Sequence, residues 1–315
     1  AISATGVAAV DPPAERHLLV VSGIGGEAYY ADLFDRWAHT MVEVATESLG
    51  LRPRNVIRLA EKPRDGIRAS RKENVLAALA EIESTSRAGD LVMLLLIGHG
   101  TSRGDRVLFN LPGPDLSADE LVGALARLEG RKLAVVNASP ASAPFVPALA
   151  SPGRIVIAAT SSPAENEHTR FGGHFVDAFA ETAADADKDG RVSLLEAFRY
   201  ARRQVDRDYE REGRLITEHA QLEDDGDGAG HRDPGPETED GRLAARFHLA
   251  HDSSASELGS RAVILQVGAR RLVDRIEALK RDKPSLETAQ YEERLETLLV
   301  DLALNRRAYR QEVGR

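Results

Sequence analysis

Short apolar runs separated by amphipathic stretches dominate the first 180 residues of the chain. The longest run is LVMLLLI at residues 91–97, which lies between Asp90 and the sequence Gly98-His99-Gly100. Seven consecutive apolar residues predict a strand that is buried on both faces, as in the centre of a parallel sheet. Shorter runs predict further strands at 17–22, 55–59, 105–110, 133–137 and 154–160.

The stretches between these strands carry the periodicity of helices. Apolar residues recur at helical spacing within 31–49, 70–86, 117–128 and 171–184. Ser70 and Ser117 are each followed three residues later by a glutamate, which predicts a capping box at the start of two of these helices. Alternating strands and helices predict an α/β class domain over residues 15–250, a three-layer sandwich with a mostly parallel central sheet.

The region 251–315 has a different pattern, with apolar residues spaced alternately three and four apart. This spacing predicts an antiparallel α-helical hairpin of coiled-coil type that is broken at Pro284, with Ser285 or Thr288 capping its second helix. The hairpin either covers its own α/β domain or pairs with another chain in a homo-oligomer. The seam residues are Leu265, Ala269, Leu272, Ile276 and Leu279, then Tyr291, Leu295, Leu298, Leu302, Asn305 and Tyr309.

Composition narrows the classes of function. The formal net charge of −9 argues against a nucleic-acid partner. No apolar run approaches the roughly 20 residues of a membrane span. The chain contains no cysteine, so it has no disulfide, thiolate metal site or cysteine nucleophile. Residues 1–14 are expected to form a flexible N-terminus, and their start at Ala1 fits a protein exported, for example to the periplasm, after removal of a signal.

Two candidate catalytic side chains follow predicted parallel strands. His99 comes directly after the strand at 91–97, and Ser139 follows the strand at 133–137. The carboxyl ends of parallel strands meet at the edge of the sheet where α/β proteins place their sites. If the two strands are neighbours, an imidazole and a hydroxyl share one crevice, which is the beginning of a nucleophile–base pair. The alternative for His99 is a structural histidine at a strand end.

The order of these segments resembles the legumain-like cysteine peptidases of the caspase-fold clan. Members of that family carry a catalytic His-Gly after the third strand and a catalytic cysteine shortly after the fourth. The resemblance therefore implies a caspase-like fold, with His99 as the base and Ser139 at the nucleophile position. It rests on residues 18–23, 94–101, 135–142 and 154–160, and on the segments Glu165-Asn166-Glu167 and Phe171-Gly172.

Three departures from the family pattern concern its catalytic machinery. Ser139 replaces a thiolate, which is the better nucleophile near neutral pH. Residues 138–143 contain Pro140 and no glycine, although glycine helps such a turn to present an oxyanion hole. Ala31 stands where the family has a substrate-binding arginine. These departures favour a catalytically inactive pseudopeptidase that binds a peptide or protein partner in the strand-end crevice. The alternative is an active cysteine endopeptidase captured with serine in place of its cysteine.

An acidic stretch at 185–196 matches the calcium-loop pattern D-x-[DN]-x-[DN]-G-x5-E at every fixed position. Alternate carboxylates wrap one cation, a glycine makes the sharp turn, and a final glutamate closes the oxygen shell. The sequence therefore predicts a bound calcium ion in an EF-hand-type loop, and similar loops occur in bacterial legumain-like relatives. The alternative is a solvated acidic loop in which Ser193 and Glu196 only cap the next helix. The predicted ligands are Asp185, Asp187, Asp189, Arg191 through its carbonyl, Ser193 and Glu196.

A second acidic run occupies residues 223–228 and reads EDDGDG. It lacks a closing glutamate at the right distance. The run is either a flexible acidic turn or an accessory cation site.

Overall fold

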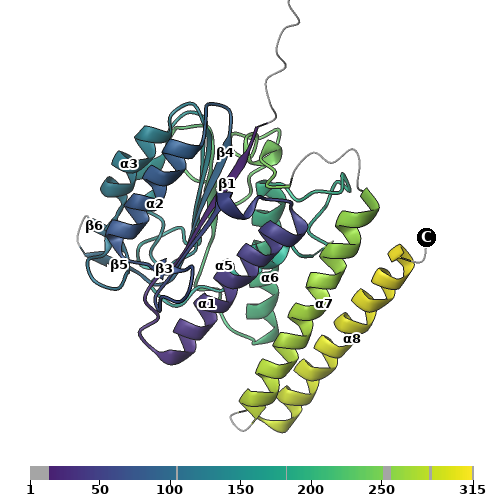
Figure 1. Cartoon of the computed structure of the whole chain (residues 1–315). Helices are drawn as coiled ribbons and strands as arrows, with labels where there is room; N and C mark the ends of the chain where they lie inside the picture. Colours follow the sequence, from purple (N-terminus) through teal and green to yellow (C-terminus); the bar gives the residue numbers. More distant parts are fainter. Residues whose placement is uncertain (1–13, 104–105, 182, 251–256, 284–285, 314–315) are drawn as a thin grey trace, which may run out of the picture.

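The chain forms an α/β domain followed by two long helices (Figure 1). The structure is a computed structural model, and it describes residues 14–103, 106–181, 183–250, 257–283 and 286–313. The expected flexible N-terminus lies outside the described residues, apart from residue 14.

A seven-stranded sheet forms the centre of the domain, in the order β10-β9-β8-β4-β1-β2-β3. Every pair of neighbours is parallel except β9 and β10. β4 pairs with β1 on one side and with β8 on the other, which confirms that the predicted strands at 91–97 and 133–137 are neighbours. The strands are β1 (Arg16–Ser22), β2 (Val56–Ala60), β3 (Arg68–Ala69), β4 (Leu91–Ile97), β8 (Lys132–Asn137), β9 (Arg154–Ala158) and β10 (Gln221–Glu223).

Helices cover both faces of the sheet, because its central strands are apolar on both sides. In β4, Met93 and Leu95 pack into one core and Leu94 and Leu96 into the other. The first core is closed by α1 (Ala28–Glu43), α5 (Phe171–Ala178) and α6 (Leu194–Arg211). The second is closed by α2 (Lys72–Thr85), α3 (Ala118–Leu125) and α4 (Phe145–Leu149). The predicted three-layer α/β sandwich is confirmed.

A small antiparallel sheet follows β4 and consists of β5 (Gly100–Arg103), β6 (Arg106–Phe109) and β7 (Leu116–Ser117). The expected strand at 105–110 is therefore the second strand of a hairpin. Short helical turns complete the domain: η1 (Val44–Ser48), η2 (Pro53–Asn55), η3 (Ala126–Leu128) and η4 (Ala244–Arg246).

The two predicted capping boxes have different outcomes. The box at Ser117 is present, because the Glu120 N–H donates to Ser117 Oγ at 3.3 Å. The box at Ser70 is wrong: α2 begins at Lys72 with no side-chain cap, and the Ser70 hydroxyl is buried without a partner. The Ser70 N–H donates to the carbonyl of Ala60, so the pairing of β3 with β2 holds this residue outside the helix.

The predicted helix at 171–184 is shorter than expected. α5 ends at Ala178, where the amides of Phe179 and Ala180 turn back to carbonyls three residues earlier. Such tight bonds are typical of the last turn of a helix.

The hairpin consists of α7 (Glu257–Asp282) and α8 (Thr288–Val313), which pack together as the spacing predicted. Asn305 lies at their seam, since a Cβ on Gly268 would come within 2.8 Å of its Nδ2. α7 lies between the domain and α8 (Figure 1), and Arg271 on α7 pairs with Asp177 at the end of α5. The hairpin therefore covers its own domain. Ser285, one of the two predicted caps, lies outside the described residues.

The outer face of α8 leaves Leu299, Val300 and Leu304 between 48% and 58% exposed. Pairing with a second chain through this face stays a prediction. None of the helices in the described part of the chain combines the length and apolar character that crossing a bilayer requires.

Candidate functional site

The carboxyl ends of β1 and β4 form the edge where the chain order of the sheet reverses. β2 lies on one side of β1 and β4 on the other, so this is a topological switch point of the kind that commonly holds ligands. Both strands end in glycine turns, at 23–26 and 98–100. The turns are in contact, because Gly23 donates its N–H to the Ile97 carbonyl at 2.8 Å. His99 lies at this edge, as the sequence predicted.

His99 is half-buried and enclosed by aromatic rings. Its Nε2 lies 3.2 Å from the carbonyl oxygen of Gly25, in the turn after β1. Tyr30 and Phe34 on α1 meet the imidazole edge to face, with ring centres 5.1 Å away in both cases. Burial lowers the pKa of His99, although the Gly25 carbonyl opposes this shift. The imidazole is therefore neutral near pH 7, the form that a general base requires.

His168 extends this aromatic group and was not identified from the sequence. Its ring lies 4.6 Å from Tyr30, 6.1 Å from Trp37 and 6.3 Å from His99. Burial, together with the neighbouring charges of His99 and Arg170, lowers its pKa to about 4. Its Nδ1 is buried without a hydrogen-bond partner. The only signal in the sequence was its position between the segments 165–167 and 171–172, which carry part of the family resemblance.

Ser139 lies beside the His99 turn but is turned inward. A Cβ on Gly100 would come within 2.7 Å of Ser139 Oγ, so the two strand ends are in contact, as predicted. Ser139 is only 1% exposed, and its hydroxyl donates to Asn137 Oδ1 at 2.7 Å. Among the described residues, no hydrogen bond joins its hydroxyl to His99. The structure thus brings the two predicted catalytic residues to one edge without linking them as a nucleophile–base pair.

Three backbone amides in the turn at 139–143 donate to internal acceptors. The Ser139 N–H donates to Asn137 Oδ1 at 3.1 Å, and the Ala143 N–H to Thr160 Oγ1 at 3.1 Å. Ala141 adopts a left-handed conformation with φ of 52° and donates its N–H to the Glu165 carbonyl at 2.8 Å. Pro140 has no N–H. An oxyanion hole needs donors that point at the substrate, and these four positions offer none.

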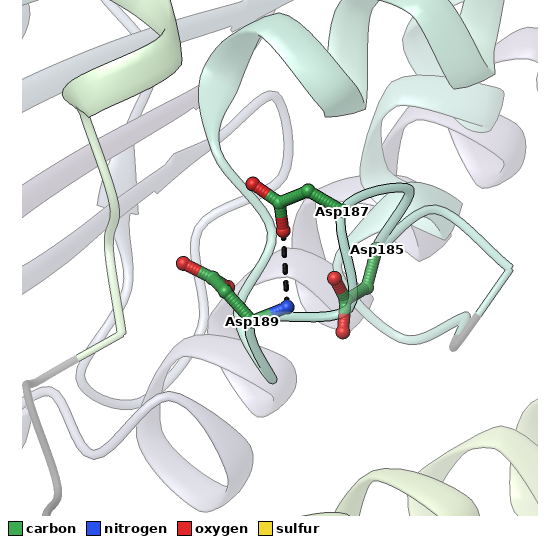
Figure 2. A group of neighbouring side chains, drawn as sticks. All are labelled: Asp185, Asp187 and Asp189. Carbon is green, nitrogen blue, oxygen red and sulfur yellow. Dashed lines mark hydrogen bonds between the residues drawn. The ribbon is translucent and has the colours of Figure 1, made fainter.

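The acidic loop gathers three of its six predicted ligands (Figure 2). One carboxylate oxygen from each of Asp185, Asp187 and Asp189 lies within 4.8 Å of the others. Asp187 Oδ1 accepts the Asp189 N–H at 3.0 Å. Gly190 makes the sharp turn with φ of +86°, and its N–H donates to Asp185 Oδ2 at 3.0 Å. The turn required by the motif is therefore present.

Two of the remaining predicted ligands, Ser193 and Glu196, have partners within the protein. Glu196 Oε2 accepts both the N–H and the O–H of Ser193 at 2.8 Å, which forms the capping box of α6. Glu196 Oε1 accepts the Ala186 N–H at 2.8 Å, so this carboxylate also ties down the loop. The Arg191 guanidinium pairs with Asp189 at 3.2 Å, and the role of the Arg191 carbonyl as a ligand stays a prediction. Ser193 and Glu196 therefore form the predicted cap of α6. Their predicted role as calcium ligands stays a prediction.

The three carboxylates could hold a metal ion. Asp185 Oδ1 is buried without a hydrogen-bond partner. Burial raises the pKa of Asp185, and the charges of Glu196 and Asp189 raise it further, against the effect of the Gly190 N–H. A divalent cation would remove this repulsion and occupy the unpaired oxygen.

The two groups of predicted site residues lie at opposite ends of the sheet. His248 connects the acidic loop to the start of β1: its Nε2 lies 3.9 Å from Asp189 Oδ2, and its carbonyl accepts from Arg16 Nε at 3.4 Å. His99 lies beyond the other end of the parallel strands. A cation in the acidic loop would therefore not touch the edge that holds His99.

The comparisons with known proteins do not assign a family. No family model matches the chain, and no curated protein matches it. Among solved structures, it is similar to protein GSU0716 from Geobacter sulfurreducens, with 14% sequence identity and a TM-score of 0.44, over 66% of this chain and 92% of that chain. A likeness of this degree establishes neither a family nor a function.

Proposed function

We propose that this chain is a catalytically silent protein of the legumain-like peptidase type, which binds a peptide or protein partner at the edge between the ends of β1, β4 and β8. The proposal rests on the resemblance of the segments around His99 and Ser139 and on the arrangement of those two residues. It places the function of the domain in recognition rather than in hydrolysis.

The observation that carries the proposal is the hydrogen bond from Ser139 Oγ to Asn137 Oδ1. A serine nucleophile needs a base that accepts its proton, and this hydroxyl is buried and donates elsewhere. The amides at 139, 141 and 143 donate to internal acceptors as well. The Ser139 hydroxyl and the amides at positions 139, 141 and 143 are therefore not directed at a substrate, which supports a silent site.

Exposed aromatic surface beside His99 supports a role in binding. Tyr29 is 59% exposed, and its ring meets that of Tyr30 at 5.2 Å. Tyr30 in turn contacts His99. Tyrosine offers a large rigid surface at low cost in conformational entropy, which is why it is common in protein interfaces.

The second candidate is an active cysteine endopeptidase in which Ser139 replaces the cysteine. The observation that favours it is the neutral His99 imidazole next to the turn that carries Ser139. Assaying Ser139→Cys against a peptide library separates the two candidates, with Ser139→Cys/His99→Ala as the matched control. The silent protein gains no cleavage in either variant. Cleavage by Ser139→Cys that disappears in the double variant would establish the peptidase instead.

We also propose that the loop at 185–196 binds calcium, which stiffens the start of α6. A thermal melt of the full chain with increasing calcium tests this, because a ligand of the folded state raises the melting temperature. The melting temperature should rise in the wild type and rise by a smaller amount in Asp187→Asn, because this variant lacks one carboxylate of the loop. No shift at millimolar calcium in the wild type would reject the site.

A further inference from the structure

Glu223 carries a buried carboxylate at the edge of the sheet. It is the last residue of β10, the antiparallel edge strand, and is 0% exposed. A buried carboxylate is costly unless it is paired or binds a metal. Glu223 should therefore have a partner for each of its carboxylate oxygens.

The two oxygens of this carboxylate differ. Oε1 accepts the N–H of Gly226, which lies in the loop that follows β10. Oε2 is buried and has no hydrogen-bond partner. Glu223 also forms no ion pair with any residue that the structure describes.

The loop after β10 brings two more carboxylates to this side chain. One oxygen from each of Glu223, Asp225 and Asp227 lies within 4.8 Å of the others. Asp225 and Asp227 are exposed, so they are open to a cation from solvent. Two glycines with positive φ, Gly226 at 91° and Gly228 at 83°, give the loop the curvature that places these alternate side chains on one side.

Arg154 lies close enough for its charge to interact with that of Glu223, but the two side chains form no ion pair. Arg154 donates from Nη1 to the Leu149 carbonyl at 2.6 Å, and its Nε is buried without a partner. Asp224 faces away from the cluster: its Oδ1 accepts the Gly241 N–H, and its Oδ2 accepts the amides of Leu243 and Ala244. The buried oxygen of Glu223 therefore remains unpaired beside two exposed carboxylates.

We propose that Glu223, Asp225 and Asp227 form a second cation site, separate from the loop at 185–196. Three carboxylates on an irregular loop suit Ca²⁺, which accepts irregular oxygen shells, better than Mg²⁺, which demands a near-ideal octahedron. The bound ion anchors the loop to the edge strand. It lies near the start of β9, because Glu223 pairs with Val156 and Gly226 packs against Pro152. This end of the sheet is remote from His99.

The test uses the full chain freed of metal with a chelator and then titrated with CaCl₂ or MgCl₂. NMR shifts of the Gly226 and Gly228 amides report this site, and those of Gly190 report the loop at 185–196. The variant is Asp225→Asn/Asp227→Asn, because both side chains are exposed and their replacement leaves buried Glu223 in place. Asp65→Asn, in an exposed turn elsewhere, is the control for the change in charge.

In the wild type and in Asp65→Asn, calcium should shift the Gly226 and Gly228 amides in a saturable way. The double variant should bind at least about tenfold more weakly at this site, since even the loss of an outer-shell partner of a metal has that effect. Its response at Gly190 should equal that of the wild type. Wild-type Gly226 and Gly228 amides that stay unshifted at millimolar calcium would overturn the proposal, as would an unchanged affinity in the double variant.

Discussion

Ser139 and Asn137 form a closed pair at the end of β8, in which both the hydroxyl and the backbone N–H of Ser139 donate to Asn137 Oδ1, at 2.7 and 3.1 Å. Asn137 is 0% exposed and belongs to the strand itself. The pair fixes the turn that would carry a nucleophile and directs its hydroxyl into the protein.

The pair predicts unequal effects on stability. Ser139→Ala removes a hydroxyl that lies 2.7 Å from Asn137 Oδ1 and 3.3 Å from the Pro140 carbonyl, and it should lower the free energy of unfolding by about 1 kcal/mol. Asn137→Ala removes the acceptor of both bonds and leaves a buried N–H without a partner, which should cost about 2 to 3 kcal/mol. Urea unfolding of both variants measures the difference. Equal losses, or a larger loss in Ser139→Ala, would contradict the importance of Asn137.

The close contact between the two strand ends predicts that Gly100 tolerates no side chain. A Cβ there would lie 2.4 Å from the Pro140 carbonyl and 2.7 Å from Ser139 Oγ, so Gly100→Ala should destabilise by about 1 to 3 kcal/mol. Gly123→Ala is the matched control, because Gly123 lies within α3 with nothing near its Cβ position. That variant should gain about 0.5 to 1 kcal/mol through helix propensity. A neutral Gly100→Ala in thermal or urea unfolding would argue against the contact.

The buried His168 predicts a loss of stability in mild acid. Its pKa in the folded protein is about 4, below the ordinary value of 6.5, so the unfolded chain binds more protons between these two values. Stability should fall as the pH drops from about 6.5 to about 4. His168→Phe keeps an aromatic ring without the titration and should flatten this fall, whereas exposed His39→Gln should not. Urea unfolding across this pH range measures the slopes, and identical slopes for His168→Phe and wild type would refute the assignment.

Glu181, which lies where the hairpin meets the domain, predicts the opposite dependence of stability on pH. Burial raises its pKa from 4.5 to about 7, aided by the charge of Asp177 and opposed by Arg271 on α7. The folded state therefore binds more protons than the unfolded chain between these values, and this group lowers stability as the pH rises from about 4.5 to 7.

Glu181→Gln stays neutral and should melt at a higher temperature than the wild type above pH 7, with little difference near pH 4. Glu292→Gln, on the exposed side of α8, is the control and should show neither effect. Melting curves at several pH values provide the measurement. A Glu181→Gln protein that is less stable than the wild type above pH 7 would mean that the charged form is favoured in the folded state.

The sequence predicted the central sheet well. Strands such as 91–97 are apolar on both faces, and a short run of this kind fits few structures other than a buried strand. It also predicted that the strand ends that carry His99 and Ser139 are neighbours, which follows from the parallel pairing of β4 and β8. The failed capping box at Ser70 has a tertiary cause, because a backbone bond to β2 decides the conformation there. Local spacing carries no information about such a bond.

The chemistry of the site was less accessible to sequence reasoning. The direction of the Ser139 hydroxyl and the acceptors of the Ala141 and Ala143 amides depend on how three separate loops meet. The contact between His168 and the aromatic residues of α1 likewise joins segments distant in the chain. In the acidic loop the positions of the three aspartates followed from spacing, whereas the use of Glu196 as a cap was only one of two alternatives.

The reactivity of a thiol at position 139 tests most directly whether His99 activates a nucleophile at this site. The chain has no cysteine, so Ser139→Cys introduces a single thiol whose alkylation by iodoacetamide can be followed against pH. Burial beside occupied amides should hold the thiol pKa at or above its ordinary value of about 8.5, with the same rate profile in Ser139→Cys/His99→Ala. Rapid alkylation near pH 6 that is lost in the double variant would contradict the account, because His99 would then be activating a nucleophile.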